Sequence, residues 1–288
     1  MSDKHVDEIS GVPTTGHEWD GIRELDNPMP RWWVWTFYTT IVWALLYAVA
    51  YPAWPLLTGS TEGLLGYSSR SEVRSDLAAA DNAKSGYMTA IKEKSIDDII
   101  ADEDLRTVAV AAGGAAFKMN CVQCHGSGAE GSKGFPNLND DDWLWGGSAD
   151  QIQQTVAHGI RFTKDGETRD SIMPPFADVL DGDQISQVST FVASLSAPVH
   201  NASLVEPGKT VFAENCAACH GDNAKGNKEM GAPDLTDAIW LYGSGEDAIA
   251  AQVRAPRVGV MPAWDARLGE TAVKELAAFV HSLGGGEK

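Results

Sequence analysis

Cysteine is scarce in this chain: only four of the 288 residues are cysteines, and all four lie in two short motifs. None is left over for a disulfide framework, a separate zinc site or core packing. Basic residues are also few, with 22 Lys and Arg against 40 Asp and Glu and a net charge of −18. This balance argues against nucleic acid as a partner. An acidic surface suits a basic protein partner, although solubility alone explains it equally well.

Long apolar runs are rare too, and the uncharged stretch 32–57 is the one of membrane-spanning length, with 26 residues. Twenty helical residues cover about 30 Å, the thickness of a bilayer's hydrocarbon core. The preceding segment 1–31 is polar and acidic, unlike the basic start of a cleaved signal peptide. We therefore predict a transmembrane helix rather than a buried core helix. Aromatic residues typical of the membrane interface flank the run: Trp32, Trp33 and Trp35 at its start, and Tyr51 and Trp54 near its end.

The four cysteines lie in two C-x-x-C-H pentapeptides, Cys121–His125 and Cys216–His220. This is the attachment motif of a c-type haem, in which both thiols bond to the porphyrin and the histidine binds the iron. A redox-active Cys-x-x-Cys pair and half of a zinc ribbon are the alternatives. A redox pair leaves the histidine unexplained, and the spacing is not that of a zinc ribbon. We predict two covalently bound haem c groups, on Cys121 and Cys124 and on Cys216 and Cys219, with His125 and His220 as axial ligands.

The sequence around the two motifs is repeated. Gly113, Phe117 and Cys121 recur as Gly208, Phe212 and Cys216, at a constant offset of 95 residues. Each copy begins with a short helix that leads into C-x-x-C-H and ends with an amphipathic helix. Both copies resemble class I cytochrome c domains, which are small and mainly α-helical. Further matching segments are Trp143–Gly146 with Trp240–Gly243, Met173-Pro174 with Met261-Pro262, and Phe191–Leu195 with Phe279–Leu283.

In class I cytochromes a Met-Pro loop supplies the second axial ligand, so the resemblance implies Met173 and Met261. Met173 lies 48 residues after His125, and Met261 lies 41 after His220. The proline after each methionine stiffens the loop and favours an extended backbone before it. A sulfur ligand raises the haem potential and closes the sixth position of the iron. The competing methionines are Met88, Met119 and Met230.

His158 is an alternative axial ligand, because it lies between the first haem motif and Met173. A haem with two histidine ligands would have a lower potential. The second copy has no histidine at the corresponding place, where Arg254 to Arg257 stand. Otherwise His158 belongs to a loop or to the haem edge.

The segment Trp19–Trp33, which reads W-D-G-I-R-E-L-D-N-P-M-P-R-W-W, resembles the N-terminal signature of one family. This family is the dihaem c-type subunit, subunit III (CcoP/FixP), of cbb3-type cytochrome oxidases. The resemblance continues through the apolar run and both haem domains. It implies an electron carrier in aerobic or microaerobic respiration, which accepts electrons from a donor cytochrome c. It would pass them through a monohaem c-type subunit to the haem-copper centre of another chain. Oxygen reduction and proton transport would belong to that complex, so this chain is not an enzyme on its own.

The haem motifs also indicate the orientation in the membrane. Arg23 and Arg31 precede the apolar run and Arg70 and Arg74 follow it, so the positive-inside rule gives a tie. Covalent haem attachment takes place on the outer side of the bacterial inner membrane, and both motifs follow the run. We therefore expect an all-α, single-pass protein with periplasmic haem domains. The expected parts are a cytoplasmic segment 1–31, a transmembrane helix 32–57, a linker 58–104, and cytochrome c domains 105–197 and 203–288.

Two other functions fit the haem motifs. One is a free-standing, membrane-anchored dihaem carrier or the cytochrome subunit of a periplasmic dehydrogenase, and the N-terminal signature argues against it. The other is a dihaem peroxidase, which requires one haem with an open sixth position.

The linker 58–104 is expected to form one or two helices near the membrane surface, with a flexible tether as the alternative.

Overall fold

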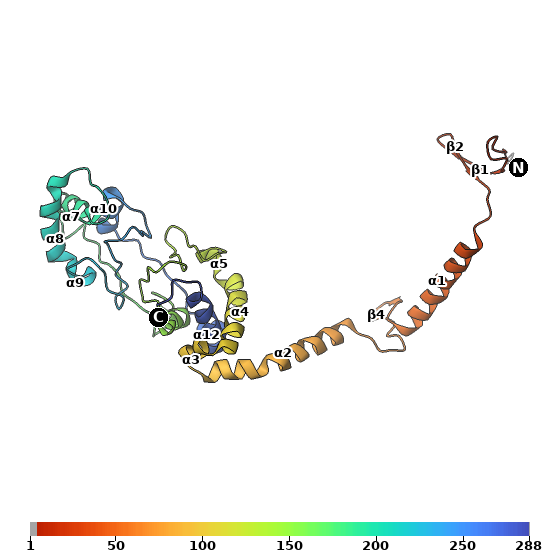
Figure 1. Cartoon of the computed structure of the whole chain (residues 1–288), viewed down its shortest axis with the longest axis horizontal. Coiled ribbons are helices and arrows are strands. Elements are labelled where there is room, and N and C mark those ends of the chain that lie inside the picture. Colours follow the sequence, from red (N-terminus) through yellow and green to blue (C-terminus); the bar gives the residue numbers. More distant parts are fainter. Residues whose placement is uncertain (1–4, 288) are drawn as a thin grey trace. The chain divides into compact units, whose positions relative to one another are not determined.

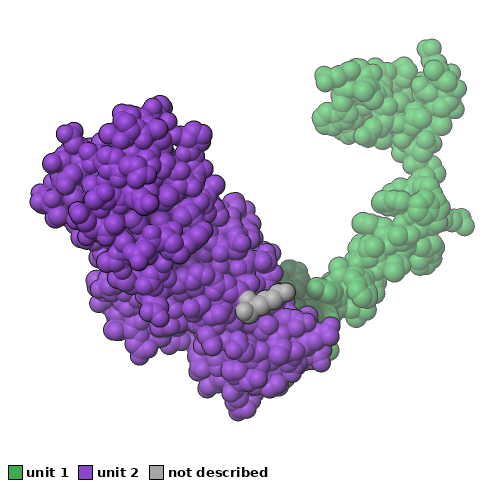
Figure 2. All heavy atoms as spheres, turned by 60° about the vertical axis from the view of Figure 1, so that its left-hand side comes forward, with its two compact units in different colours: residues 1–82 green, residues 83–288 purple. Residues whose placement is uncertain are grey.

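The computed structural model describes residues 5–287 and divides the chain into two units, which meet between residues 82 and 83 (Figure 2). About half of the chain is helical, and the strands of the described residues form only two small antiparallel hairpins. The all-α prediction is therefore confirmed. The hairpins belong to the first unit and the helices that surround the cysteines to the second.

The first unit begins with the hairpin β1 (Thr14–Trp19) and β2 (Ile22–Leu25), in which Trp19 pairs with Ile22. The turn between them is Asp20-Gly21, and both residues have a positive φ, of 46° and 84°. This is the backbone that a two-residue hairpin of the Asp-Gly type requires. A second hairpin, β3 (Pro55–Leu56) and β4 (Gly59–Ser60), lies beyond the apolar helix.

The helix α1 (Arg31–Ala50) forms most of the predicted membrane span. In residues 5–287 it is the one helix long and apolar enough to cross a bilayer, and none of its residues, all of which are described, is buried by the rest of the chain. The hydroxyl groups of its three threonines donate to main-chain carbonyls one turn earlier, so these polar groups need no water. The helix ends at Ala50 rather than at residue 57, because Pro52 forces Tyr51 into an extended conformation.

The linker is largely helical. The helix α2 (Ser69–Glu93) runs from the first unit into the second, and the short helix α3 (Ile96–Ala101) follows it. The Ser95 side chain caps α3 by accepting from the main-chain N–H of Asp98. The remaining helices are α4 (Glu103–Asn120), α5 (Val122–His125), α6 (Ala149–His158), α7 (Gly182–Ser194), the 3₁₀ helix η1 (Ala202–Leu204), α8 (Val205–Asn215), α9 (Ala217–His220), α10 (Glu246–Arg254), α11 (Asp265–Leu268) and α12 (Glu270–His281).

The described residues of the second unit contain two hydrophobic cores, and their helices do not follow chain order (Figure 1). In the first core, α3, α4 and α6 pack with α12, the last helix of the chain. In the second core, α7 packs with α8 and α10. The packing thus differs from the linear division into 105–197 and 203–288: the two sequence repeats have exchanged their terminal helices. The short connection 195–201 favours this arrangement, because elements joined by few residues tend to pack together.

The two helix crossings have the same construction. At Gly113 of α4, an added Cβ would lie 2.0 Å from the carbonyl oxygen of Glu275 on α12. At Gly208 of α8, it would lie 2.0 Å from the carbonyl oxygen of Gln187 on α7. A phenylalanine pair accompanies each crossing at 5.3 Å between ring centroids. The two pairs are Phe117 with Phe279 and Phe191 with Phe212, so each pair joins a residue of one repeat to a residue of the other.

A glycine-to-alanine change at a crossing should destabilise the second unit. We expect Gly208→Ala to lower the free energy of unfolding by ~1–3 kcal/mol, because the methyl group has to displace backbone of α7. Denaturant unfolding of the haem-loaded protein measures this change. Gly86→Ala, in α2 where the added methyl meets open space, is the matched control and should raise stability by up to about 1 kcal/mol. Equal stability of Gly208→Ala and the unaltered protein would contradict a close crossing.

Candidate haem-binding sites

A partly open cavity lies within the first core, and its empty volume of about 800 Å³ includes the solvent at its opening. Cys121 and His125 line it from the end of α4 and from α5, and Met261 lines it from the loop before α11. Apolar and aromatic side chains form most of the wall, among them Phe117, Leu138, Trp143, Trp145, Trp264 and Leu276.

The turn after α4 places the first motif at this cavity. The N–H of Cys121 still donates to the carbonyl of Phe117, at 2.8 Å, so the cysteine continues directly from the helix end. One helical turn later, the Nδ1 of His125 lies 3.1 Å from the carbonyl oxygen of Pro136. Burial lowers the pKa of His125, although this hydrogen bond opposes the shift. A neutral imidazole whose Nδ1 is engaged offers its Nε2 to a metal ion.

The second motif has the same local geometry. Cys216 and His220 are each 9% exposed, and the Nδ1 of His220 lies 3.3 Å from the carbonyl oxygen of Pro233. Burial lowers the pKa of His220 as well. Cys216 belongs to the second core, and Met173 and Trp240 pack against that core.

The thiols do not have the character of a redox pair. Burial, together with the neighbouring cysteine of the same motif, raises the pKa of both Cys121 and Cys216 to about 11. Reactive thiols of redox pairs have lowered pKa values instead. Within residues 5–287, no three His, Cys, Asp or Glu side chains are grouped as a metal ion would require, which also argues against a zinc ribbon. The thiol of Cys121, the engaged imidazole of His125 and the side chain of Met261 around an apolar cavity fit a c-type haem, and the motif supplies the second thiol at the exposed Cys124.

The structure places each methionine beside the haem motif of the other sequence repeat. Met261 lines the cavity of His125, whereas Met173 packs against the core of His220. The backbone of Met261 is fixed by a pair of hydrogen bonds with Ile160, each 3.0 Å long. Gly159 permits this approach, because an added Cβ there would lie 2.2 Å from the carbonyl oxygen of Met261. The linear repeat had instead suggested His125 with Met173 and His220 with Met261.

The alternative ligands lie elsewhere. His158 is not among the described residues that line the first cavity, and its two ring nitrogens face carboxylates. Its Nδ1 lies 3.2 Å from Asp165, and its Nε2 lies 3.3 Å from Glu167. Met119 and Met230 are exposed, at 78% and 37%, and Met88 lies on α2.

Comparison with known proteins identifies the family of the chain. Three family models match in succession: the N-terminal domain of cytochrome oxidase-cbb3, FixP, at 11–58; cytochrome c at 110–196; and cytochrome c oxidase, cbb3-type, subunit III, at 203–280. The cbb3-type cytochrome c oxidase subunit FixP of Sinorhizobium medicae is 63% identical over 99% of this chain and 98% of its own. The chain belongs to the FixP/CcoP family. The CcoP subunit of Cereibacter sphaeroides is 54% identical over 96% of both chains, and that of Azospirillum is 50% identical over 100% of both.

The family matches confirm the predicted family and the presence of two cytochrome c domains. They do not register the exchange of helices, because each family model follows a continuous stretch of sequence. The model at 110–196 includes α7 and the model at 203–280 includes nearly all of α12, while in space α7 and α12 belong to the opposite cores. The exchange is therefore visible in the three-dimensional packing of the helices and not in the sequence matches.

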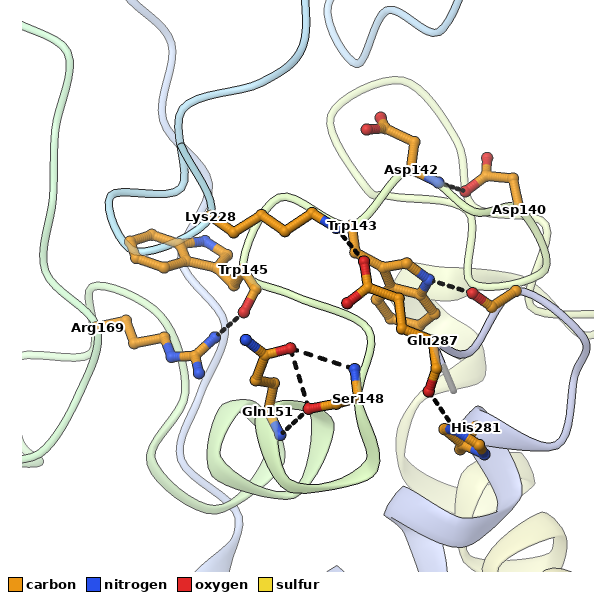
Figure 3. Close-up of polar contacts among 11 residues, drawn as sticks. Asp140, Asp142, Trp143, Trp145, Ser148, Gln151, Arg169, Lys228, His281 and Glu287 are labelled. Carbon is orange, nitrogen blue, oxygen red and sulfur yellow. Dashed lines mark hydrogen bonds and ion pairs between the residues drawn. The ribbon is translucent and has the colours of Figure 1, made fainter. Parts of the chain in front are cut away.

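Trp145 lies where the two repeats meet. Its side chain lines the first cavity, and an added Cβ at Gly231, in the loop after the second motif, would lie 2.3 Å from its ring. The guanidinium groups of Arg161 and Arg169 lie 5.8 and 5.6 Å from the ring centroid. Arg169 also donates to the Trp145 carbonyl, at 2.5 Å (Figure 3). The sequence repeat makes Trp145 the counterpart of Tyr242, but it gives no sign of the two arginines.

The C-terminal segment closes over the neighbouring tryptophan. The indole Nε1 of Trp143 donates to the carbonyl of Gly285, at 2.6 Å (Figure 3). Glu287 pairs with Lys228, and its main-chain N–H donates to the carbonyl of Gly147. Residues after α12 thereby fix the tryptophan loop of the other repeat, which extends the exchange beyond the helices.

Acidic loops from both repeats lie close to the same place. Burial raises the pKa of Asp142 to about 6, and the negative charges of Asp237 and Asp140 add to the shift. Burial also raises the pKa of Asp140. Asp142 lines the first cavity. Because its pKa is raised, its carboxyl carries a proton at a pH where an exposed aspartate is ionised.

Asp142 should make stability depend on pH. Its pKa is raised on folding, so the folded state binds more protons than the unfolded state between about pH 4 and 6, and stability falls as the pH rises through this window. We expect Asp142→Asn to be more stable than the unaltered protein at pH 7 and to lose part of this decline. Urea unfolding of the haem-loaded protein at several pH values measures both effects. The exposed Asp141→Asn is the control, and an unchanged pH profile in Asp142→Asn would count against the assignment.

Proposed function

We propose that this chain relays electrons within a cbb3-type cytochrome c oxidase, as an electron-transfer subunit that holds two haem c groups. The observation that carries the proposal is the convergence of Cys121, His125 and Met261 on one apolar cavity. A bound haem c supplies a one-electron iron couple. His125 and Met261 would both bind the iron of this haem, which would leave no iron position open for oxygen or peroxide. Such a site suits transfer of electrons and not catalysis.

The ligand pairs that the packing supports are His125 with Met261 and His220 with Met173. Thioether bonds to Cys121 and Cys124 would fix the first haem, and bonds to Cys216 and Cys219 the second. The Pro136 and Pro233 carbonyls hold the two imidazoles in the same orientation. Each haem domain then takes its histidine from one sequence repeat, 105–197 or 203–288, and its methionine from the other.

The chain is anchored in the membrane by α1, and its partners include the other subunits of the oxidase. We place the segment 1–31 in the cytoplasm and the haem domains in the periplasm, because covalent haem attachment takes place on that side of the bacterial inner membrane. A monohaem c-type subunit and the haem-copper subunit are the expected acceptors, in that order. A basic cytochrome c is the expected donor, since opposite charge accelerates the encounter.

Substituting each methionine tests the ligand pairs. In a variant that lacks Cys121 and Cys124, only the haem on the second motif remains. We expect Met173→Leu to remove the methionine–iron band from that haem and lower its potential, whereas Met261→Leu should leave both unchanged. The matched variant that lacks Cys216 and Cys219 should show the reverse dependence. Visible spectra and redox titration give the readout, and the uncrossed pattern would overturn the pairing.

Purification of the native complex tests the function itself. After mild solubilisation of membranes, this chain should co-purify with a second c-type cytochrome, with b-type haem and with oxygen consumption driven by reduced cytochrome c. A haem-stained gel and an oxygen-uptake assay measure these properties. If the chain is recovered alone and consumes no oxygen, it is a free-standing carrier.

A further inference from the structure

Both methionine loops converge on one side chain outside the haem cavity. The Nε of Arg161 donates to the carbonyl oxygen of Ser171, at 2.8 Å, and its Nη1 donates to the carbonyl oxygen of Gly259, at 3.0 Å. Ser171 stands two residues before Met173, and Gly259 stands two residues before Met261. One guanidinium group therefore connects the two loops that carry the proposed axial ligands.

The backbone holds Arg161 firmly at this position. Its φ is +54°, a region that side-chain-bearing residues seldom adopt, and the N–H of Arg161 donates to the carbonyl of Arg169, at 2.8 Å. The main-chain N–H of the preceding Ile160 donates to the carbonyl of Met261, and the N–H of Met261 donates to the carbonyl of Ile160. The guanidinium is half-buried above Trp145, and burial lowers its pKa, yet arginine stays charged at any physiological pH. A charge-assisted bond to a carbonyl is about twice as strong as a neutral one.

We propose that Arg161 is a positioning residue that couples the two axial methionine loops, so that ligation at one haem depends on the same side chain as ligation at the other. The proposal rests on the crossed ligand pairs described above. The planar fork of arginine donates in two fixed directions, which suits two carbonyls that belong to different loops. Without it, both carbonyls lose their charged donor at once, and both loops gain freedom to move away from the iron.

Two neighbouring arginines provide matched controls. Arg169 also lies over the Trp145 ring, 5.6 Å from its centroid, and donates to Trp145, Thr155 and Gln154. Arg257 lies 5.0 Å from the ring centroid of Tyr242, the counterpart of Trp145, and donates to the Tyr242 carbonyl, at 3.1 Å. Each is an arginine against an aromatic ring, but neither guanidinium bridges Ser171 and Gly259 in the described residues.

The test replaces Arg161 in the assembled, haem-loaded oxidase. In Arg161→Gln we expect the methionine–iron band to weaken at both haems, both potentials to fall, and carbon monoxide to bind both reduced haems at least about tenfold faster, since loss of about 1.4 kcal/mol of loop stabilisation corresponds to a factor of ten. Arg161→Lys, which keeps the charge without the fork, should change both haems in the same direction by less. Arg169→Gln and Arg257→Gln should each alter one haem at most. Redox titration combined with low-temperature spectra resolves the two haems.

The outcomes separate this proposal from the ligand assignment. If the unaltered protein shows methionine ligation at both haems and Arg161→Gln changes neither or only one, the coupling is overturned while the ligands stand. If the unaltered protein lacks methionine ligation, the ligand pairs themselves are overturned. If Arg161→Gln fails to assemble, Arg161→Lys decides: a change at both haems supports the coupling, and a change at one or none refutes it.

Discussion

The haem sites depend on two close backbone contacts, Gly113 against Glu275 and Gly208 against Gln187. The first fixes α12 across α4, and α4 ends directly at Cys121. The loop that carries Met261 leads into α11 and α12, so the same crossing sets where this methionine lies relative to His125. A side chain at either glycine would separate the helices and widen the cavity that the crossing closes. The methionine that we propose for each histidine therefore follows from which terminal helix crosses α4 and which crosses α8.

The exchange makes the two sites mutually dependent. The first core contains α12 and the second contains α7, so neither sequence repeat carries a complete core. The chain after residue 202 supplies Met261, Trp264 and the last helix to the first site, and its final residues hold Trp143. Small domains bury little surface, and sharing helices adds contacts that two independent repeats would lack. Neither the stability of one core nor the ligand pair that we propose for it can be assigned to one half of the chain.

Much of the architecture could be predicted from local sequence, and the rest could not for definite reasons. The C-x-x-C-H motifs, the apolar run and the Trp19–Trp33 signature indicated haem attachment, a membrane anchor and the family, because each is encoded within a few residues. The early end of α1 at Ala50 could have been expected from Pro52. The pairing of helices could not, because Phe191 and Phe279 occupy equivalent positions and present the same surface to either partner. Arg161 gave no signal, since its role depends on two loops that meet only in the folded chain.

A relay requires donor and acceptor groups at a fixed separation, and the interwoven second unit meets this requirement without a bound partner. Two domains joined by a flexible tether would sample many separations, because a linker of several residues allows wide motion. Here the chain passes between the two cores more than once. Trp145 of one repeat packs against Gly231 of the other, and Gly134 donates to the carbonyl of Leu241. Relative motion of the haem sites would break these contacts together with the helix crossings. The crossing of the repeats thus fixes the loops that carry the proposed ligands and, by the same contacts, the position of the two cores relative to each other.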